Sequence, residues 1–221
     1  MGLLSAAFAA NPHVLEANLA NANAELADYA AADILAWALA RASKPVISTN
    51  FRPGSAALLH MVVQARPDIP VIWVDTGYNT PATYRYAEEL HRAWRLNLHC
   101  YTPRVSAARR QAVSGGIPGS DAVDFMRFAR DAKIEPFERA FNELAPDVWF
   151  TGIRAVQNDF RAGLGAVSRG PRNTLRVAPL YRWSDAEVTA YLERHGIADN
   201  GDYVDPTKPA QHLECGLQRL A

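Results

Sequence analysis

The spacing of hydrophobic and polar positions changes several times along the chain, and each change predicts a new element. Apolar residues at helical spacing predict two helices between residues 11 and 41. Short apolar and β-branched runs, separated by longer helical patterns, then predict five strands at residues 45–49, 68–75, 96–103, 147–154 and 174–180. This alternation predicts a doubly wound, mostly parallel α/β sheet with flanking helices.

Helix boundaries between these strands carry clear local signals. Thr80 before Pro81 is typical of a helix start, because threonine caps the first turn and proline is accepted at its first position. Ser184 and Glu187 have the spacing of a capping box, and Gly196 is a typical stop. The helix between Ser184 and Gly196 is therefore the last regular element that we predict.

The domain organisation follows from the end of this pattern. Beyond residue 196, glycine, aspartate and proline interrupt any helical or strand spacing of apolar residues. We expect one nucleotide-binding α/β domain over residues 1–196, with a helical N-terminal part over residues 1–44. Residues 197–221 are expected to form a mobile C-terminal tail.

Composition narrows the class of protein. The 221 residues include 23 basic and 23 acidic side chains, a balance that provides no electrostatic footprint for nucleic acid. Two cysteines are too few for a four-cysteine zinc site, an iron–sulfur cluster or a disulfide scaffold, and the six histidines lack metal-ligand spacing. No signal peptide or membrane span is apparent. We expect a soluble cytoplasmic protein without metal, membrane or nucleic-acid partners.

Three loops follow predicted strands, and the carboxyl ends of parallel strands are where ligands bind in such sheets. The first loop offers hydroxyls, backbone amides and an arginine for an anion: Ser48, Thr49, Asn50, Phe51, Arg52 and Ser55. The second is Asp75, Thr76 and Gly77, whose aspartate could bind a hydroxyl or cap its own turn. The third carries Arg154 and Arg161, whose guanidinium forks suit phosphate or sulfate. Together these loops predict a polyanion site.

The two cysteines, two strand tryptophans and one histidine are expected either to pack in the core or to take part in chemistry. Cys100 lies within an apolar strand pattern, and we expect it, with Trp73 and Trp149, to be buried in the core. His60 is expected to pack rather than to bind a ligand. Cys215 lies in the predicted tail between Glu214 and Gly216, so either the tail packs as a structural lid or the thiol reacts. The cationic loops favour reaction, because positive charge would lower the pKa of the thiol. We therefore predict that Cys215 is a nucleophile.

At this point the sequence resembles a known family. The motifs VISTNFRPGSAALLHMV, RPDIPVIWVDTGYNT, VWFTGIRAVQNDFRA and the terminal ECGL occur in the order found in thioredoxin-dependent phosphoadenylylsulfate (PAPS) reductases. The resemblance covers nearly all of the chain from Ala32 onward. It implies a fold similar to the ATP pyrophosphatases, with an adenine-nucleotide α-hydrolase-like core.

The resemblance also implies a mechanism. The Cys215 thiolate would attack the sulfur of PAPS, and thioredoxin or glutaredoxin would then release sulfite from the S-sulfocysteine. Glu214 and His212 would support the thiol, and the three loops would bind the nucleotide and its phosphosulfate. No iron–sulfur cluster is implied, because the extra cysteine pairs of the related adenylylsulfate (APS) reductases are missing. A homodimer is a further implication of the family.

Some positions depart from the family pattern and keep alternatives open. Leu213 stands where a basic residue is usual, Gln218 where histidine is usual, and Ala155 where a second arginine is usual. The alternatives are a cluster-free APS reductase and a nucleotide-binding protein impaired in catalysis. An adenylyl transferase of the ATP-pyrophosphatase type would need a Ser-Gly-Gly-x-Asp-Ser loop, which the stretch STNFRPGS lacks.

Overall fold

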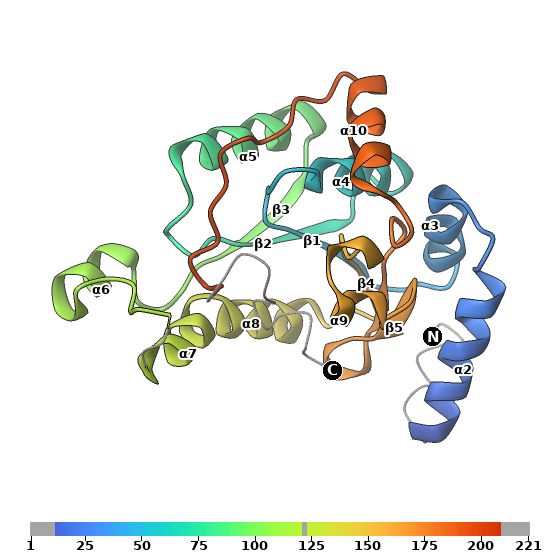
Figure 1. The fold of residues 1–221 in the computed structure, drawn as a ribbon, viewed down its shortest axis with the longest axis horizontal. Helices are drawn as coiled ribbons and strands as arrows, with labels where there is room; N and C mark the ends of the chain where they lie inside the picture. The colour runs from blue at the N-terminus through green and yellow to red at the C-terminus, as the bar shows by residue number, and fades with distance from the viewer. Residues whose placement is uncertain (1–11, 121–122, 209–221) are drawn as a thin grey trace.

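A computed structural model of the chain describes residues 12–120 and 123–208, and Figure 1 shows their arrangement. The strands are β1 (Pro45–Thr49), β2 (Pro70–Val74), β3 (Asn97–Tyr101), β4 (Val148–Phe150), β5 (Val167–Arg169) and β6 (Leu175–Val177). The helices are α2 (Pro12–Glu25), α3 (Ala31–Leu39), α4 (Ser55–Ala65), α5 (Pro81–Trp94), α6 (Ala107–Ser114), α7 (Val123–Ala129), α8 (Glu135–Leu144), α9 (Asp159–Ala162) and α10 (Asp185–Arg194). Three short turns of other helix types complete them, η1 (Arg130–Ile134), η2 (Ala155–Gln157) and η3 (Pro171–Asn173).

The six strands form one sheet in the order β3-β2-β1-β4-β6-β5. All neighbours pair in parallel except β5, which runs antiparallel to β6 at the edge. The prediction of a mostly parallel sheet is confirmed. The stretch after β4, which we predicted only as a loop with Arg154 and Arg161, contains more regular structure, because residues 167–169 pair along β6 and others form η2, α9 and η3.

Helices cover both faces of the sheet, as burial of a parallel sheet requires. Figure 1 shows α4, α5 and α10 on one face and α7 and α8 on the other. Under α8 a compact aromatic cluster contains Phe137, Phe141 and Trp149, each 1% exposed or less. Trp73 is buried in the larger cluster on the opposite face, so the expected core positions of Trp73 and Trp149 are confirmed.

The predicted helix caps are present. Thr80 Oγ1 accepts a hydrogen bond from the Thr83 amide at 3.1 Å, one turn into α5. Ser184 and Glu187 form a reciprocal capping box at the start of α10. These short-range contacts depend only on neighbouring residues, which is why the sequence predicts them.

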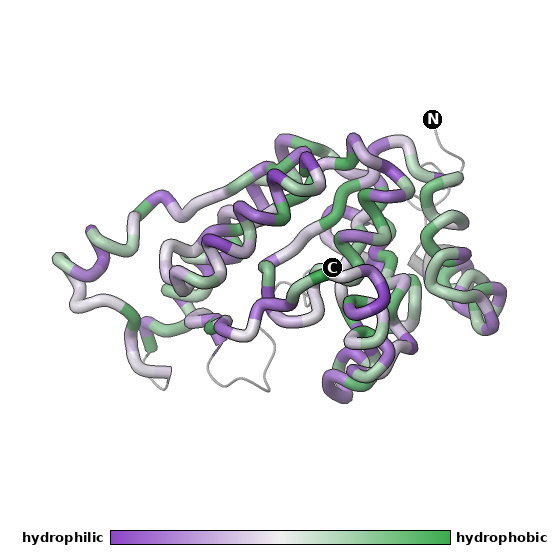
Figure 2. The backbone as a smooth tube through the Cα atoms, turned by 90° about the horizontal axis from the view of Figure 1, so that it is seen from above, coloured by the Kyte–Doolittle hydropathy of each residue, from purple (hydrophilic) through white to green (hydrophobic). Residues whose placement is uncertain are grey.

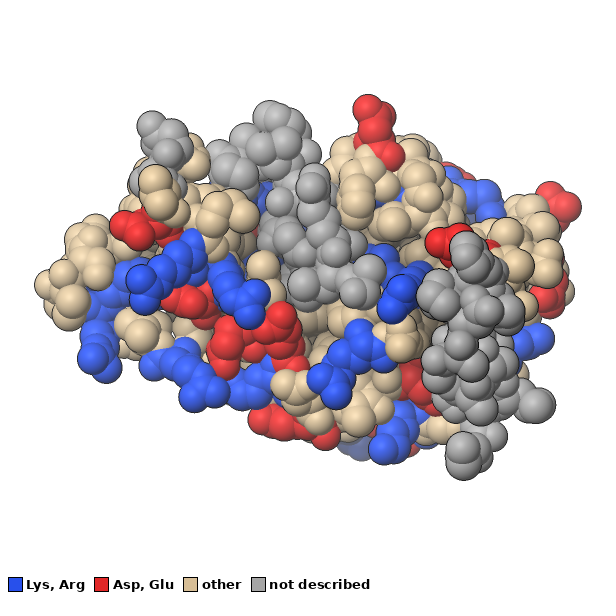
Figure 3. Space-filling view, turned by 90° about the horizontal axis from the view of Figure 1, so that it is seen from below, with Lys and Arg blue, Asp and Glu red and all other residues tan. Residues whose placement is uncertain are grey.

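The helices between β3 and β4 reach away from the sheet. In the view of Figure 2, α6 projects from one end of the molecule, and it buries no side chain. From α7 through the π-helical turn η1 into α8 the chain stays helical. Figure 3 shows basic and acidic side chains interspersed on this side. Glu135 of α8 pairs with both Arg104 and Arg139. That face is therefore charged but largely neutralised.

Residues 197–208 pack against the body of the protein, although we expected them to begin a mobile tail. Figure 1 shows this segment running from α10 across α5 toward the α7–α8 side of the sheet. Asn200, Asp205 and Thr207 are each 4% exposed or less. Tyr86 of α5 donates to the Ala198 carbonyl at 2.9 Å. The described part of the predicted tail therefore belongs to the folded unit, and the boundary at residue 196 stays a prediction.

Candidate active site

A cavity of about 370 Å³ lies at the carboxyl ends of the central strands. From β1 the chain crosses to β2 and β3 on one side, and later returns to β4 on the other side. Such a reversal of strand order leaves a crevice between the diverging loops, which is where α/β sheets bind ligands. The position of the cavity therefore follows from the topology.

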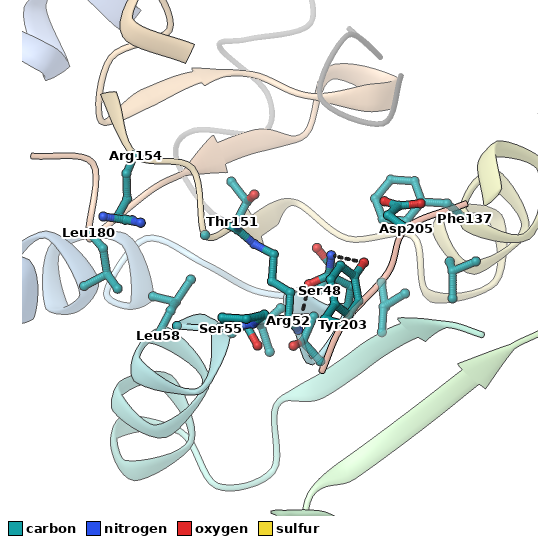
Figure 4. Close-up of a pocket in the computed structure, with 18 of the residues that line it drawn as sticks. Ser48, Arg52, Ser55, Leu58, Phe137, Thr151, Arg154, Leu180, Tyr203 and Asp205 are labelled. Carbon is teal, nitrogen blue, oxygen red and sulfur yellow. Dashed lines mark hydrogen bonds between the residues drawn. The ribbon is translucent and has the colours of Figure 1, made fainter. Parts of the chain in front are cut away.

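The walls of the cavity come from both layers of the fold. Figure 4 shows Leu58 and Leu180 on one side and Phe137 with Asp205 on the other, with Ser48, Arg52 and Ser55 between them. Among the described residues, its charged lining consists of Arg52, Lys133, Arg154, Arg161, Lys208 and Asp205. Five cationic side chains against one carboxylate make this a site for an anionic ligand.

The loop after β1 contributes most of the predicted residues. Ser48, Thr49, Asn50, Arg52 and Ser55 all line the cavity. Ser55 Oγ is buried and has no hydrogen-bond partner within the part of the chain that the structure describes. A buried hydroxyl without a partner is costly, and a ligand oxygen in the cavity would satisfy it.

The backbone of this loop differs from our expectation of an amide cradle. The Phe51 amide donates to Thr49 Oγ1 at 3.2 Å, and the Ser55 amide donates to the Arg52 carbonyl at 3.0 Å. Gly54 has a φ of 75°, which favours glycine, and its amide donates to the Asp199 carboxylate at 2.9 Å. These amides are already bonded, so side chains are left to contact an anion.

Phe51 itself does not face the cavity. Its side chain is 0% exposed and stacks edge-on against Trp73, with 5.1 Å between ring centroids. The backbone turns at Phe51 with a φ of 53°, and its ring packs within the larger core cluster. The structure therefore does not bring Phe51 together with the other predicted site residues, and its role there stays a prediction.

Arg154 and Arg161, which follow β4, both line the cavity and share one partner. Gln157 Oε1 accepts from the Arg154 amide at 3.0 Å and from an Nη1 hydrogen of Arg161. The Arg154 guanidinium also donates to the Asp185 carboxylate and to the Trp183 carbonyl. Both arginines are thus held in place before any ligand binds, which favours recognition of a bidentate oxyanion.

The turn after β2 remains outside the cavity. Asp75 Oδ1 accepts from the Gly77 amide at 2.9 Å, from Asn79 at 2.8 Å and from the Tyr84 hydroxyl at 2.8 Å. The carboxylate therefore closes its own turn, which was the alternative to ligand binding. Asp75, Thr76 and Gly77 do not line the cavity, and their place in a nucleotide site stays a prediction.

Sequence reasoning missed several residues of the cavity. Lys133 from the π-helical turn η1 and Asp205 from residues 197–208 form an ion pair in its wall. Tyr203, whose hydroxyl accepts from Asn50 at 2.8 Å, and Lys208 also line it. A π-helical turn often occurs at a functional position, but no sequence pattern predicted this one.

The remaining reactive residues lie elsewhere. Cys100 is exposed, so its expected core position is wrong. The reason is that β3 is an edge strand of the sheet. Cys215, Glu214 and His212 lie outside the described residues.

We expected neither a metal nor a membrane partner, and the described residues do not test either expectation. In residues 12–120 and 123–208, no group of three or more His, Cys, Asp or Glu side chains could hold a metal ion. No helix in these ranges is both long and apolar enough to cross a membrane. The absence of metal and membrane partners stays a prediction.

Comparison with known proteins decides the family. The model of the phosphoadenosine phosphosulfate reductase domain matches residues 44–203, which is most of the chain. The chain belongs to this reductase family. A phosphoadenosine 5′-phosphosulfate reductase of Synechococcus sp. is 40% identical over 182 residues, which cover 81% of this chain and 78% of that protein. Reductases of Xanthomonas campestris are 39% identical over 177 residues.

Solved structures agree on the fold. A PAPS reductase from Candida auris, solved as a phosphate complex, superimposes with a TM-score of 0.71 at 23% identity, covering 82% of this chain and 87% of that one. The FMN adenylyltransferase of Candida glabrata superimposes with a TM-score of 0.52 at 16% identity, covering 71% of this chain and 48% of that one. Both superpositions support the predicted mostly parallel α/β fold.

Proposed function

We propose that the protein is a PAPS reductase, an oxidoreductase that reduces PAPS to sulfite and adenosine 3′,5′-bisphosphate in sulfate assimilation. The observation that carries this proposal is the cationic cavity at the strand reversal of a chain that belongs to the reductase family. PAPS carries a 3′-phosphate and a phosphosulfate, so it needs several cationic groups. The cavity offers Arg52, Arg154 and Arg161 together with two lysines.

The proposed chemistry uses the thiol of Cys215. Its thiolate attacks the sulfonate sulfur, a sulfur–sulfur bond forms, and the bond from sulfur to the bridging phosphate oxygen breaks. Adenosine 3′,5′-bisphosphate leaves with the electron pair of that bond. The two thiols of reduced thioredoxin or glutaredoxin then supply two electrons, sulfite leaves, and the carrier protein becomes a disulfide. Cationic side chains offset the repulsion between thiolate and phosphosulfate.

Several features of this proposal come from the family and from the composition. The chain has two cysteines, too few for a four-cysteine cluster in one chain, so we expect turnover without iron–sulfur cofactors. Thioredoxin or glutaredoxin as donor and a homodimeric state are part of the proposal. Glu214 and His212 are proposed to support the thiol.

The test combines turnover with detection of the intermediate. Full-length protein is incubated with PAPS, reduced thioredoxin and thioredoxin reductase, and sulfite is measured; APS and glutaredoxin replace their counterparts in parallel assays. Without a reductant, mass spectrometry should show one added SO₃ on Cys215. Cys215→Ser should abolish sulfite release, whereas Cys100→Ser, which removes the other cysteine, should leave it unchanged.

The outcomes separate the alternatives. Faster turnover of APS than of PAPS would identify an APS reductase instead. Nucleotide binding without any sulfite release would indicate a binding protein, in keeping with Leu213 and Gln218. Sulfite release by Cys215→Ser would exclude the proposed nucleophile.

A further inference from the structure

Trp149 of β4 donates a hydrogen bond from its indole Nε1 to Ser48 Oγ at 2.8 Å. The two side chains lie on the same face of the sheet, because Trp149 pairs in register with Val46 and Ser48 follows Val46 by two residues. Trp149 is 0% exposed, whereas Ser48 lines the cavity. This bond therefore connects the core under α8 with the cavity wall.

The indole is fixed by its surroundings. The ring centroids of Phe137 and Phe141 lie 5.1 Å and 5.5 Å from that of Trp149, and the Arg176 guanidinium lies 5.8 Å from the indole centroid. Turning the N–H away from Ser48 would require repacking of this aromatic cluster. The direction of the donor is thus set by tertiary packing.

The hydrogen-bonding capacity of the Trp149 indole and the Ser48 hydroxyl decides which of them donates and which accepts. An indole N–H only donates, so Ser48 Oγ must accept, and its own proton is left to donate elsewhere. Across residues 12–120 and 123–208, the structure assigns Ser48 Oγ no second hydrogen bond. Among the described residues, five of the six charged side chains that line the cavity are cationic donors and cannot accept this proton. An oxygen atom of a bound ligand is the matching acceptor.

We propose that Trp149 is a positioning residue, which fixes the Ser48 hydroxyl as a hydrogen-bond donor to a phosphate or sulfate-ester oxygen in the cavity. The identity of this ligand rests on the proposed function. Trp149 lies in strand β4, outside the three loops predicted to bind the ligand. It acts through Ser48 and does not contact the ligand.

The test is a double-variant cycle on full-length protein, with adenosine 3′,5′-bisphosphate as the probe and calorimetry as the measurement. Ser48→Ala should weaken binding about tenfold, the change expected when one hydrogen bond to a charged acceptor is lost. Trp149→Phe should weaken it by a smaller factor of about three to five. In the Ser48→Ala background, Trp149→Phe should change the affinity less than about twofold, because the group that it orients is gone.

Trp73→Phe is the matched control. Trp73 is also a strand tryptophan in the core, but its Nε1 has no hydrogen-bond partner within the described part of the chain. This variant should lose packing without losing affinity. Equal losses from Trp73→Phe and Trp149→Phe, or losses from Ser48→Ala and Trp149→Phe that multiply, would show that Trp149 acts through the core alone and would overturn the inference.

A second measurement covers the case in which Trp149→Phe does not fold. In ¹⁵N-labelled wild-type protein the probe should shift the Trp149 indole N–H resonance, and Ser48→Ala should remove most of that shift. An unchanged Trp149 resonance in a wild-type protein that binds the probe would overturn the inference alone. Wild-type protein that binds neither the probe nor PAPS would contradict the proposed function and the inference together.

Discussion

Lys133 and Asp205 form an ion pair between η1 and residues 197–208, with side chains only 7% and 3% exposed. The Asp205 carboxylate also accepts from the amide and the hydroxyl of Thr207. A charge this deeply buried is tolerated only when its partner and further hydrogen bonds replace water. The pair therefore ties the chain segment after α10 to the cavity wall.

Asp205→Asn should lower the free energy of unfolding by about 3–5 kcal/mol at pH 7, because it leaves the Lys133 ammonium buried without its counter-ion. Burial raises the pKa of Asp205, but the charge of Lys133 and the hydrogen bonds from Lys133 and Thr207 outweigh this and lower it overall. The stabilisation is therefore complete above about pH 4, the ordinary aspartate value, and is lost as the pH falls through the folded-state pKa.

Urea unfolding of both proteins at several pH values checks this. The difference between wild type and variant should be constant from about pH 5 to 8 and should shrink below about pH 4. Asp68→Asn, which removes the carboxylate of the exposed Arg66–Asp68 pair, is the control and should leave stability unchanged. A difference that persists undiminished at the lowest pH would contradict the assignment.

Asn200→Ala should loosen residues 197–208. Its Nδ2 donates to the Phe51 carbonyl at 2.7 Å and to Thr83 Oγ1 at 2.9 Å, in a setting only 3% exposed. The variant leaves the Phe51 carbonyl without this donor, whereas Thr83 Oγ1 keeps its bonds with Thr80 Oγ1 and the Asp202 carbonyl. The loss should cost about 1–3 kcal/mol, and hydrogen exchange of residues 197–208 should speed up. Asn97→Ala, which removes one hydrogen bond at an exposed site, should leave the hydrogen exchange of residues 197–208 unchanged. Equal exchange in both variants would show that Asn200 does not hold the segment.

Gln157→Ala should weaken nucleotide binding about fivefold without unfolding the protein. The amide oxygen of Gln157 accepts from both the Arg154 backbone and the Arg161 guanidinium, and its removal takes away one contact that orients each of them. Calorimetry with adenosine 3′,5′-bisphosphate measures the change. Gln111→Ala on the projecting helix α6 is the control, since within the described part of the chain the Gln111 side chain donates only to the nearby Gly115 carbonyl. Unchanged affinity in Gln157→Ala would remove it from the support of the site.

His60→Gln should reduce the loss of stability in mild acid. His60 Nδ1 lies 2.9 Å from the Tyr191 hydroxyl, and its ring lies 4.9 Å from that of His195, so it packs as expected. Burial, with repulsion from His195, lowers the pKa of His60. The unfolded chain therefore binds the proton more readily, and stability falls as the pH drops below about 6.5.

Thermal unfolding at pH 7.5 and pH 5.5 tests this prediction. The melting temperature of wild type should fall more between the two pH values than that of His60→Gln. Tyr191→Phe, which removes the hydroxyl but keeps both histidines, should retain the wild-type dependence. Identical pH dependence in wild type and His60→Gln would assign the acid sensitivity to other groups.

The sequence predicted those features that depend on neighbouring residues. The apolar runs around Val46, Ile72 and Trp149 marked strands, the Thr80 and Ser184 caps marked helix starts, and the alternation of elements implied a parallel sheet with its site at the carboxyl ends. Periodicity and capping act over a few residues, so they can be read without a structure.

Pairings between distant residues were decided by the tertiary structure alone. Three residues of β5 became a strand only because β6 offered an unpaired edge, and Cys100 became exposed because β3 lies at the other edge. Asp75 turned toward its own loop, whereas Asp205 reached Lys133, 72 positions away in the chain. The sequence alone determined where the strands end and which anion-binding groups follow them. The packing of segments far apart in the chain decided which of those groups surround one cavity, because burial and charge pairing are settled only when the whole chain is compact.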